Sequence, residues 1–315
     1  MATCLGKGRK GADHVDFGWM PELPEVETIR RRLLPDLEGR VVRRVLLSLP
    51  RLLEGCAPDE LARLEGLRCA GIERHGKYLL ARFGEGSPAH ALVIHLGMSG
   101  QLTWKGAGEP VVDRFRRLPS GLAAPLGAHS VDRHTHLRIV FQDGGELLFR
   151  DPRTFGRLLL APVDAVAELP RLARLGPDAL GIAESVFRSR WKEFRGARSV
   201  KAILLDQGFL AGIGNIYADE ACHEALIRPG VRSSTLTAAR VGKLACAVQA
   251  ALLRGLDNCG TTFRDFVHPD GSHGENQEDL RVYARGGKPC LSCGTTLRKG
   301  VVAGRGTVWC PRCQA

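Results

Sequence analysis

The chain has 315 residues, a length that accommodates two ordinary domains, each with its own core. Its composition, 44% hydrophobic and 25% charged, is typical of a soluble globular protein, and no apolar run is long enough for a transmembrane helix. The net charge is +11 and most of the 45 basic residues are Arg, which favours a polyanionic partner, either a nucleic acid or an anionic membrane surface.

The first motif along the chain is Met20-Pro21-Glu22, which looks like an internal start. A chain that begins at Met20 and loses this Met exposes Pro21 as a free secondary amine. At pH 7 roughly a tenth of an α-amino group is neutral, against under about a thousandth of a Lys side chain. Because only the neutral amine attacks carbon, Pro21 would be a ready nucleophile with Glu22 as a neighbouring general acid. The competing interpretation is a turn followed by an acidic helix start.

Residues 1–19 conflict with this chemistry, because they place the nitrogen of Pro21 in a peptide bond. They carry charges but no apolar core, which excludes a secretory signal peptide. We therefore expect an unstructured extension that is either absent from the cell or removed, so that the active protein begins at Pro21.

The next segments are predicted to form one helix and then β structure. Apolar residues recur with helical spacing over residues 25–34, Pro24 suits the first turn, and Pro35 and Gly39 are expected to end the helix. Residues Gly106–Ser130 are rich in Pro, Gly and Arg and predict a long surface loop. Alternating apolar runs separated by Gly, Pro and Asp predict antiparallel strands at Val41–Leu49, Leu67–Ile72, Tyr78–Phe83, Ala91–Leu96, Leu137–Phe141, Glu146–Phe149 and Leu158–Leu160.

After Pro162 the pattern becomes helical. The residues therefore indicate a β-rich domain, a helical domain and a small C-terminal hairpin, with the first boundary near residues 165–180. The predicted helices are Ala165–Leu175, Ser185–Phe194, Val200–Asp206, Ala218–Ala225 and Thr237–Leu256.

Four of the ten cysteines form a metal-binding pattern: Cys290-x2-Cys293, sixteen residues, then Cys310-x2-Cys313. Two such pairs bring four thiolates within reach of one tetrahedral Zn²⁺. The alternative is two disulfides, although nothing in the chain points to secretion. The other six cysteines show no pairing pattern and are interpreted as thiols of a cytosolic protein.

Gly212-Ile213-Gly214-Asn215 precedes one of the predicted helices, and Asn215 is well placed to cap it. An uncapped helix start binds phosphate through its N–H groups, and Lys201 is a second candidate phosphate contact. The motif is not a dinucleotide fingerprint, because Tyr217 stands where the third Gly should be.

Taken together, these motifs resemble one family over residues 20–315. Their order is the one found in bacterial formamidopyrimidine-DNA glycosylases. The motifs are Pro-Glu-Leu-Pro-Glu-Val-Glu-Thr (21–28), Gly-Lys-Tyr-Leu-Leu (76–80), His-Leu-Gly-Met-Ser-Gly (95–100), Asp-Pro-Arg-Thr-Phe-Gly (151–156), Gly-Ile-Gly-Asn-Ile-Tyr (212–217) and the four-Cys hairpin.

The resemblance implies a bifunctional DNA glycosylase/AP lyase of base excision repair. The family removes oxidised purines, such as 8-oxoguanine and formamidopyrimidines, from duplex DNA and then nicks the strand by β,δ-elimination. Pro21 matches the nucleophile that attacks C1′ and forms a Schiff base, and Glu22 matches the acid that helps to open the sugar. Lys77 matches the proton donor assigned to β-elimination and Arg305 the one assigned to δ-elimination. By itself, Lys77 would be interpreted as a solvated surface residue.

The resemblance also implies contacts with DNA and a set of side chains that replace the extruded nucleotide. An apolar wedge supports a kinked step once the damaged base has left the stack, and core packing is the alternative for such side chains. His95 is interpreted as a structural histidine, and a surface position is the alternative for His134 and His136. The matched DNA and phosphate contacts are His134, Arg153, Lys201 and Asn215, and the replacing trio is Met98, Arg153 and Phe155.

The implied fold is α+β and multidomain. It comprises an N-terminal antiparallel β-sandwich domain with a leading helix, a helical helix–two-turn–helix domain and a zinc-bound β-hairpin. We expect one structural Zn²⁺, damaged double-stranded DNA as the partner without a membrane, a monomer, and a cytoplasmic location in a bacterium. The expected bounds are 1–19 for the extension, 20–165 for the catalytic domain, 175–270 for the DNA-binding domain and 280–315 for the zinc finger.

Two segments depart from the family pattern. Residues 265–280 contain Gly274-Glu275-Asn276-Gln277, whereas family members often carry an aromatic residue after the Gly. The resemblance therefore defines the preferred base less well than it defines the type of reaction. Ala197 stands at the position of one further basic contact, with Arg198 beside it.

Three other functions compete with this interpretation. An endonuclease VIII-like glycosylase would prefer oxidised pyrimidines, but that branch has Gly at the position of Leu23. A non-catalytic DNA-binding protein would result if Pro21 stays capped. A zinc-ribbon RNA binder is a third alternative, although no RNA-reading module is present.

Overall fold

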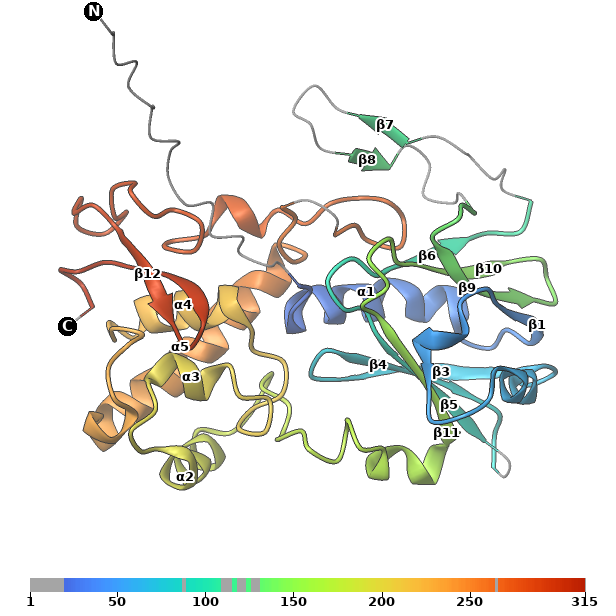
Figure 1. The fold of residues 1–315 in the computed structure, drawn as a ribbon, viewed down its shortest axis with the longest axis horizontal. Helices are drawn as coiled ribbons and strands as arrows, with labels where there is room; N and C mark the ends of the chain where they lie inside the picture. Colours follow the sequence, from blue (N-terminus) through green and yellow to red (C-terminus); the bar gives the residue numbers. More distant parts are fainter. Residues whose placement is uncertain are drawn as a thin grey trace, which may run out of the picture.

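The computed structural model describes residues 20–86, 89–108, 115–117, 123–125, 131–263 and 266–314. A β-rich lobe from the first half of the chain lies beside a helical lobe that also carries the C-terminal hairpin (Figure 1). This arrangement is the predicted α+β multidomain fold. No helix in the described part of the chain is long and apolar enough to cross a membrane.

The β-rich lobe is a sandwich of two sheets with a shared apolar core. In the first sheet all neighbours are antiparallel, and in the second only the β2–β11 pair is parallel. The first sheet has the order β1 (Val42–Leu47), β9 (Thr135–Phe141), β10 (Glu146–Arg150) and β6 (Gln101–Lys105). The second has the order β2 (Leu53–Glu54), β11 (Arg157–Pro162), β5 (His90–His95), β4 (Tyr78–Phe83) and β3 (Cys69–His75).

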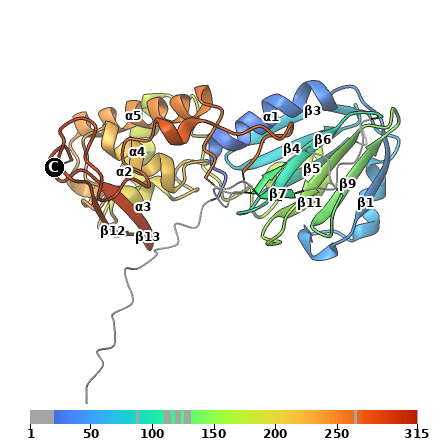
Figure 2. The same ribbon diagram turned by 90° about the horizontal axis from the view of Figure 1, so that it is seen from above.

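Helix α1 (Leu23–Leu37) joins the two lobes. It runs along the sandwich, with its N-terminus at the junction of the lobes (Figure 2). Leu23 packs in the core of the helical lobe, whereas Val26, Ile29 and Leu33 pack in the core of the sandwich. The first turn of α1 is therefore held by both lobes, which fixes the direction in which Pro21 and Glu22 enter the junction.

The helical lobe is built around α5, against which α1, α2 and α4 pack. Gly255 permits the close approach of α4, because a Cβ there would lie 2.4 Å from the Tyr217 hydroxyl oxygen. The helices are α2 (Glu184–Phe194), α3 (Val200–Leu204), α4 (Asn215–Glu224) and α5 (Ala238–Asp257), and the 3₁₀ helices of the chain are η1 (Pro50–Leu52), η2 (Pro58–Leu64), η3 (Val163–Glu168), η4 (Ser233–Thr235) and η5 (Asn276–Glu278).

The C-terminal hairpin pairs β12 (Arg298–Val302) with β13 (Arg305–Trp309). It has its own small apolar core, made of Val282, Cys290, Leu297, Val308 and Cys310. The hairpin lies against α4, so the helical lobe and the cysteine unit form one continuous body (Figure 1).

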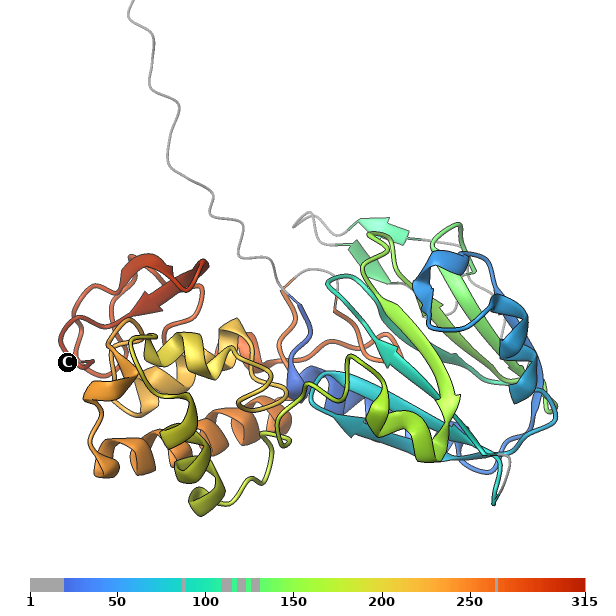
Figure 3. The ribbon, with the colours of Figure 1, turned by 60° about the horizontal axis from the view of Figure 1, so that its bottom comes forward.

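Two sequence-based expectations about local structure are wrong, and two strands of the sandwich were not expected. Helix α1 continues through Pro35 to Leu37, because Pro35 lies on the exposed side of the helix. The segment 165–175 forms only the 3₁₀ helix η3 followed by turns, which lead into the helical lobe (Figure 3). Pro170 lacks the N–H that a helix needs, and the leucines there instead cover the second sheet. The unexpected strands of the sandwich are β2 and β6.

Two other expectations fall largely or wholly outside the described residues. Within the predicted loop Gly106–Ser130, the described segments pair as β7 (Phe115–Arg117) and β8 (Ala123–Pro125). The extension 1–19 lies outside the described residues.

Candidate active site

A cavity of about 850 Å³ lies where the two lobes and the hairpin meet. Met20 and Glu22 line it on either side of Pro21, which is itself buried. The predicted catalytic residues Glu22, Lys77 and Arg305 reach this cavity from three different parts of the chain. Among the other residues that line it are His95, Met98, Asn215 and Tyr283.

The carboxylate of Glu22 occupies the start of helix α4. Its oxygens accept hydrogen bonds from the backbone N–H groups of Gly214 (2.8 Å), Ile216 (2.8 Å) and Tyr217 (3.3 Å). This corrects two expectations: the helix start binds a carboxylate of the chain itself, and Gly214, not Asn215, is the N-cap. Gly214 is required for this approach, because a Cβ there would lie 2.3 Å from the Glu22 carboxyl carbon.

Burial raises the pKa of Glu22 to about 7, against the lowering effects of the Lys77 charge and of the N–H groups of Ile216 and Tyr217. A carboxyl group with this pKa is protonated in a large fraction of molecules at neutral pH and still ionises readily. Glu22 therefore has the proton affinity that a general acid needs near its working pH.

Glu25, three residues after Glu22, is a second fully buried carboxyl group, and the sequence-based predictions assign it no role. It accepts hydrogen bonds from the Glu22 N–H (2.9 Å), the Tyr217 hydroxyl (2.8 Å) and the Thr261 N–H (2.7 Å). Burial raises its pKa. The Glu22–Glu25 spacing is that of a capping box, and this signal was available in the sequence.

Lys77 lies in the two-residue turn between β3 and β4, where His75 pairs with Tyr78. Gly76 begins the turn with a φ of +56°, a conformation that favours glycine, and a Cβ there would lie 2.8 Å from that of Ala211. Lys77 is 6% exposed, and burial lowers its pKa, against the raising effects of Glu22 and Glu25. Its amine therefore loses a proton more easily than a solvated Lys.

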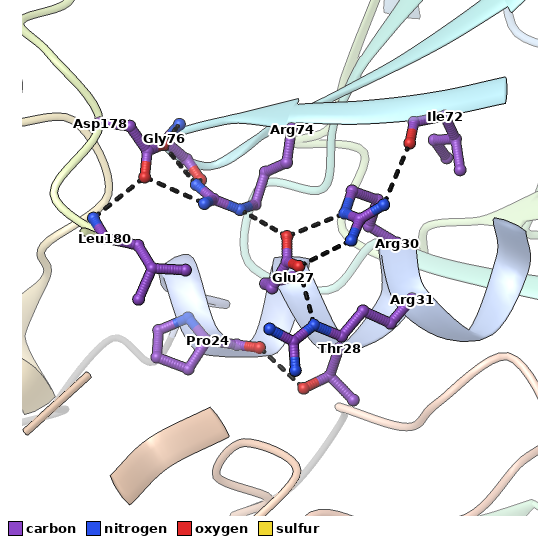
Figure 4. Close-up of polar contacts among 10 residues, drawn as sticks. All are labelled: Pro24, Glu27, Thr28, Arg30, Arg31, Ile72, Arg74, Gly76, Asp178 and Leu180. Atoms are coloured by element: carbon purple, nitrogen blue, oxygen red, sulfur yellow. Dashed lines mark hydrogen bonds and ion pairs between the residues drawn. The ribbon is translucent and has the colours of Figure 1, made fainter. Parts of the chain in front are cut away.

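A chain of ion pairs ties the Lys77 turn to α1 and to the segment between the lobes (Figure 4). Arg74 donates to Glu27 of α1 (3.0 Å) and to Asp178 (2.9 Å). Asp178 also accepts the Gly76 N–H at 2.7 Å. Although burial raises the pKa of Glu27, hydrogen bonds from Arg30, Arg31 and Arg74 lower it to about 2. The turn that carries Lys77 is thus fixed relative to the helix that carries Glu22.

His95 lines the same cavity, although the sequence predicts a structural role for it. Its Nδ1 accepts the Gly97 N–H (3.1 Å), which leaves the proton on Nε2, and its ring lies 4.7 Å from that of Tyr78. Burial, followed by the Lys77 charge, lowers the pKa of His95 to about 4. A neutral imidazole with one donor is therefore available in the cavity wall, and the motif His-Leu-Gly-Met could have indicated it.

The loops that carry Met98, Arg153 and Phe155 are fastened together. Ser99 Oγ donates to Asp151 (2.5 Å) and accepts the Arg153 N–H (3.1 Å). A Cβ on Gly97 would lie 2.6 Å from the Phe155 carbonyl carbon, so only glycine allows this approach. Phe155 is 48% exposed, with the Arg153 guanidinium 5.0 Å from its ring centroid. An exposed Phe does not fit the core-packing alternative.

The other predicted DNA contacts occupy different surroundings. His134 is half-buried, and its backbone N–H donates to the Asp132 carboxylate (2.8 Å). Asn215 lines the cavity and donates to the Gly306 carbonyl (3.1 Å). Lys201 is fully buried, and its ammonium contacts Asp219 (2.6 Å), Thr307 (2.8 Å) and the Gly306 carbonyl (3.1 Å). All three donors of Lys201 are engaged, so it joins α3, α4 and the hairpin and has none left for a phosphate.

The four cysteines of the hairpin unit form one cluster. Their sulfurs all lie within 4.8 Å of one another, with Cys293 and Cys310 at 3.5 Å and Cys290 and Cys313 at 4.0 Å. Four Zn–S bonds of about 2.3 Å in a tetrahedron require S···S distances of roughly 3.8 Å, whereas a disulfide requires about 2.0 Å. The cluster therefore fits one structural zinc and excludes the two-disulfide alternative.

Comparisons with known proteins match every part of this arrangement. Residues 20–158 match the formamidopyrimidine-DNA glycosylase N-terminal domain, residues 175–267 its H2TH domain, and residues 287–315 the zinc finger found in FPG and IleRS. The formamidopyrimidine-DNA glycosylase of Pelotomaculum thermopropionicum is 38% identical over 299 residues, which cover 94% of this chain and 99% of the relative. The chain belongs to the formamidopyrimidine-DNA glycosylase family.

Further relatives and solved structures agree with this membership. The formamidopyrimidine-DNA glycosylase of Symbiobacterium thermophilum is 41% identical, with 94% of this chain and 89% of the relative covered. A complex between the Lactococcus lactis Fpg and an abasic site containing DNA has a TM-score of 0.78 and 30% identity, over 93% of this chain and 99% of that chain. A Lactococcus lactis Fpg bound to an N7-benzyl-Fapy-dG containing DNA is 31% identical, with a TM-score of 0.78 and the same coverage.

Proposed function

We propose that this chain is a bifunctional DNA glycosylase/AP lyase of base excision repair. It excises oxidised purines from duplex DNA through a Schiff base at Pro21 and nicks the strand by β,δ-elimination. The observation that carries the proposal is the single cavity that holds Glu22, Lys77 and Arg305 beside Pro21. The full-length relatives named above support the substrate class.

Base release uses the two residues at the start of α1. The neutral amine of Pro21 attacks C1′ of the damaged nucleoside, and the base leaves with the bonding electrons and takes up the proton that the amine nitrogen loses. Glu22 donates the proton that helps to open the sugar ring, for which its pKa of about 7 is suited. The product is an iminium between Pro21 and the opened sugar, and its positive charge acidifies the neighbouring C–H.

Strand cleavage follows from that acidity. Loss of a proton next to the iminium breaks the bond to the 3′ phosphate oxygen, and Lys77 supplies a proton in this β-elimination. A second loss of a proton breaks the bond to the 5′ phosphate oxygen, and Arg305 supplies a proton in this δ-elimination. Arg305 is exposed at the start of β13, where a hairpin tip can enter the minor groove.

DNA binding places the damaged base at this cavity. We propose that Met98, Arg153 and Phe155 fill the space left by the extruded nucleotide, since their loops are fastened to one another beside the cavity. His134 and Asn215 contact the DNA. The four thiolates hold one Zn²⁺, which neutralises part of their charge and fixes the hairpin that carries Arg305.

We further propose that the work is divided among 20–165 (catalysis), 175–270 (DNA binding) and 280–315 (zinc finger). The protein would act as a monomer on damaged double-stranded DNA. A cytoplasmic location suits its thiolate cluster and its free cysteines.

The test uses protein with Pro21 at its N-terminus and a duplex that contains one 8-oxoguanine. We expect the base to be released, the strand to be cut and borohydride to cross-link protein to DNA, while an undamaged duplex gives none of these products. A duplex with an oxidised pyrimidine is the matched comparison. Faster processing of that duplex would favour the endonuclease VIII-like alternative, and binding without cross-linking would favour the non-catalytic one.

Arg305→Ala should separate zinc binding from strand cleavage. Arg305 lies outside the cysteine cluster, so elemental analysis should still find one zinc per chain. The product with a 3′-phosphate from δ-elimination should fall by about 10²-fold, the usual effect of losing an acid–base group, while borohydride trapping persists. Wild-type protein that contains no zinc when freshly purified would contradict the metal assignment.

Duplex binding should weaken steeply with salt. Arg153 and Arg305 are exposed near the cavity in a protein of net charge +11, and Lys201 is not counted because its ammonium is buried. If about four to five phosphates are neutralised, log K should fall against log salt with a slope of roughly −4. Fluorescence anisotropy between low and physiological salt measures this slope, and a value near zero would show that the basic residues are not used on DNA.

A further inference from the structure

His223 lies next to the cysteine cluster but belongs to a different part of the chain. It comes from the last turn of α4 and is 2% exposed. Its Nε2 lies 3.7 Å from the sulfur of Cys290, whereas its Nδ1 is buried and has no hydrogen-bond partner among the described residues. A buried imidazole that leaves one nitrogen unpaired requires an explanation.

The cost of the unpaired Nδ1 must be offset by what the imidazole gains at Nε2. Leaving a buried polar atom unpaired costs about 1–3 kcal/mol, a cost that an apolar side chain of similar size would avoid. With its proton on Nε2, His223 donates to a sulfur that is a thiolate when zinc is bound. Hydrogen bonds to an ionised acceptor are roughly twice as strong as those between neutral groups, so this contact can offset the unpaired Nδ1.

His223 does not belong to the set of metal ligands itself. Within the described residues, the group of donor atoms that lie within 4.8 Å of one another contains only the four sulfurs. Four thiolates around one Zn²⁺ leave a net charge of −2, so a donor from outside the cluster removes part of the excess negative charge from Cys290.

We propose that His223 donates a hydrogen bond to the Cys290 thiolate and thereby slows the loss of zinc from the finger. This contact also joins α4 of the helical lobe to the zinc unit, since Cys290 packs in the core of that unit. The proposal concerns metal retention and does not depend on the catalytic function proposed above.

The experiment compares three variants of the purified zinc-loaded protein. His223→Phe removes the donor and preserves much of the ring volume, and His223→Gln keeps an N–H donor. His90→Phe is the matched control, because His90 is also buried with an unpartnered Nδ1 but lies in β5 of the sandwich.

Zinc release to an excess of a chromophoric chelator is followed at neutral pH. We expect release from His223→Phe to be about 10-fold faster or more, the usual effect of losing such a partner. His223→Gln should recover most of the difference, and His90→Phe should match the wild type.

Two results would overturn the proposal. The first is equal release rates for His223→Phe and the wild type, which would make the contact mere packing. The second concerns the cobalt-substituted protein, which should show the absorption of a four-sulfur site in both the wild type and His223→Phe. A wild-type spectrum with a nitrogen ligand that is lost in the variant would make His223 a ligand instead. If His223→Phe proves unstable in thermal melting, His223→Leu, which also lacks a donor, takes its place in both measurements.

Discussion

The form that retains residues 1–19 should bind damaged duplex DNA but should neither cut it nor form a borohydride cross-link. The nitrogen of Pro21 is then a tertiary amide, which is not basic, does not attack C1′ and cannot form an iminium. Removal of a catalytic nucleophile typically costs roughly 10⁴- to 10⁶-fold in rate, so the loss should be nearly complete rather than graded. The form that begins at Pro21 should cut and cross-link.

The comparison requires two proteins whose N-termini are verified by mass spectrometry, one starting at Met1 and one at Pro21. Both are assayed on the same duplex with one 8-oxoguanine, and binding is measured in parallel to show that both are folded. Lys77→Ala in the Pro21 form is a useful control, because it retains the amine and should still cross-link. If the intact Met1 form cross-links as well as the short form, Pro21 is not the nucleophile, and Lys77 would have to be considered instead.

Glu22→Gln should lower the rate of 8-oxoguanine release by about 10²- to 10⁴-fold, the usual contribution of a general acid. Cutting of a preformed abasic site should be less affected, because its base has already left. Single-turnover assays on the two duplexes measure the two steps separately. Equal losses on both duplexes would show that Glu22 acts in the elimination steps or in folding, and not as the acid of base release.

The pH dependence of base release provides a second readout for the same residue. The protonated form of Glu22 is required, and burial raises its pKa to about 7. Because the neutral fraction of the Pro21 amine grows over the same range, release by the wild type should level off as pH rises through 7, whereas the residual activity of Glu22→Gln should keep rising.

The same pKa also has a consequence for stability. Because the folded-state pKa lies above the usual 4.5, the contribution of Glu22 to stability is fully present below pH 4.5 and is lost as pH rises through about 7. Denaturant unfolding of the wild type and of Glu22→Gln across this range measures the difference.

The sequence by itself determined most of the helices and strands and the metal site of this protein. Apolar runs separated by turn residues predicted the strands β4, β9 and β10, whose side chains are mostly buried, and that pattern is local. The cysteine spacing predicted one zinc site because two short loops bring four sulfurs together whatever surrounds them. The motifs around Pro21, Lys77 and Phe155 predicted the family, because their residue types and order suffice for the resemblance.

Only the tertiary structure decided how charged groups are paired and which are buried. The carboxylate of Glu22 lies at the start of α4, although 192 positions separate Glu22 from Gly214. Neither the sequence around Glu22 nor the sequence around Gly214 predicts this contact. The sequence does not distinguish Lys201 from an exposed basic residue. Folding places its ammonium against Asp219 and the hairpin, where no N–H is left to bind DNA. Three properties of the site depend on burial by distant segments. They are the pKa of Glu22, the Nε2–H that His95 presents to the cavity, and the contact between His223 and Cys290. Burial and long-range pairing are properties of the packed chain, so local sequence patterns predict the parts of the site but not its electrostatics.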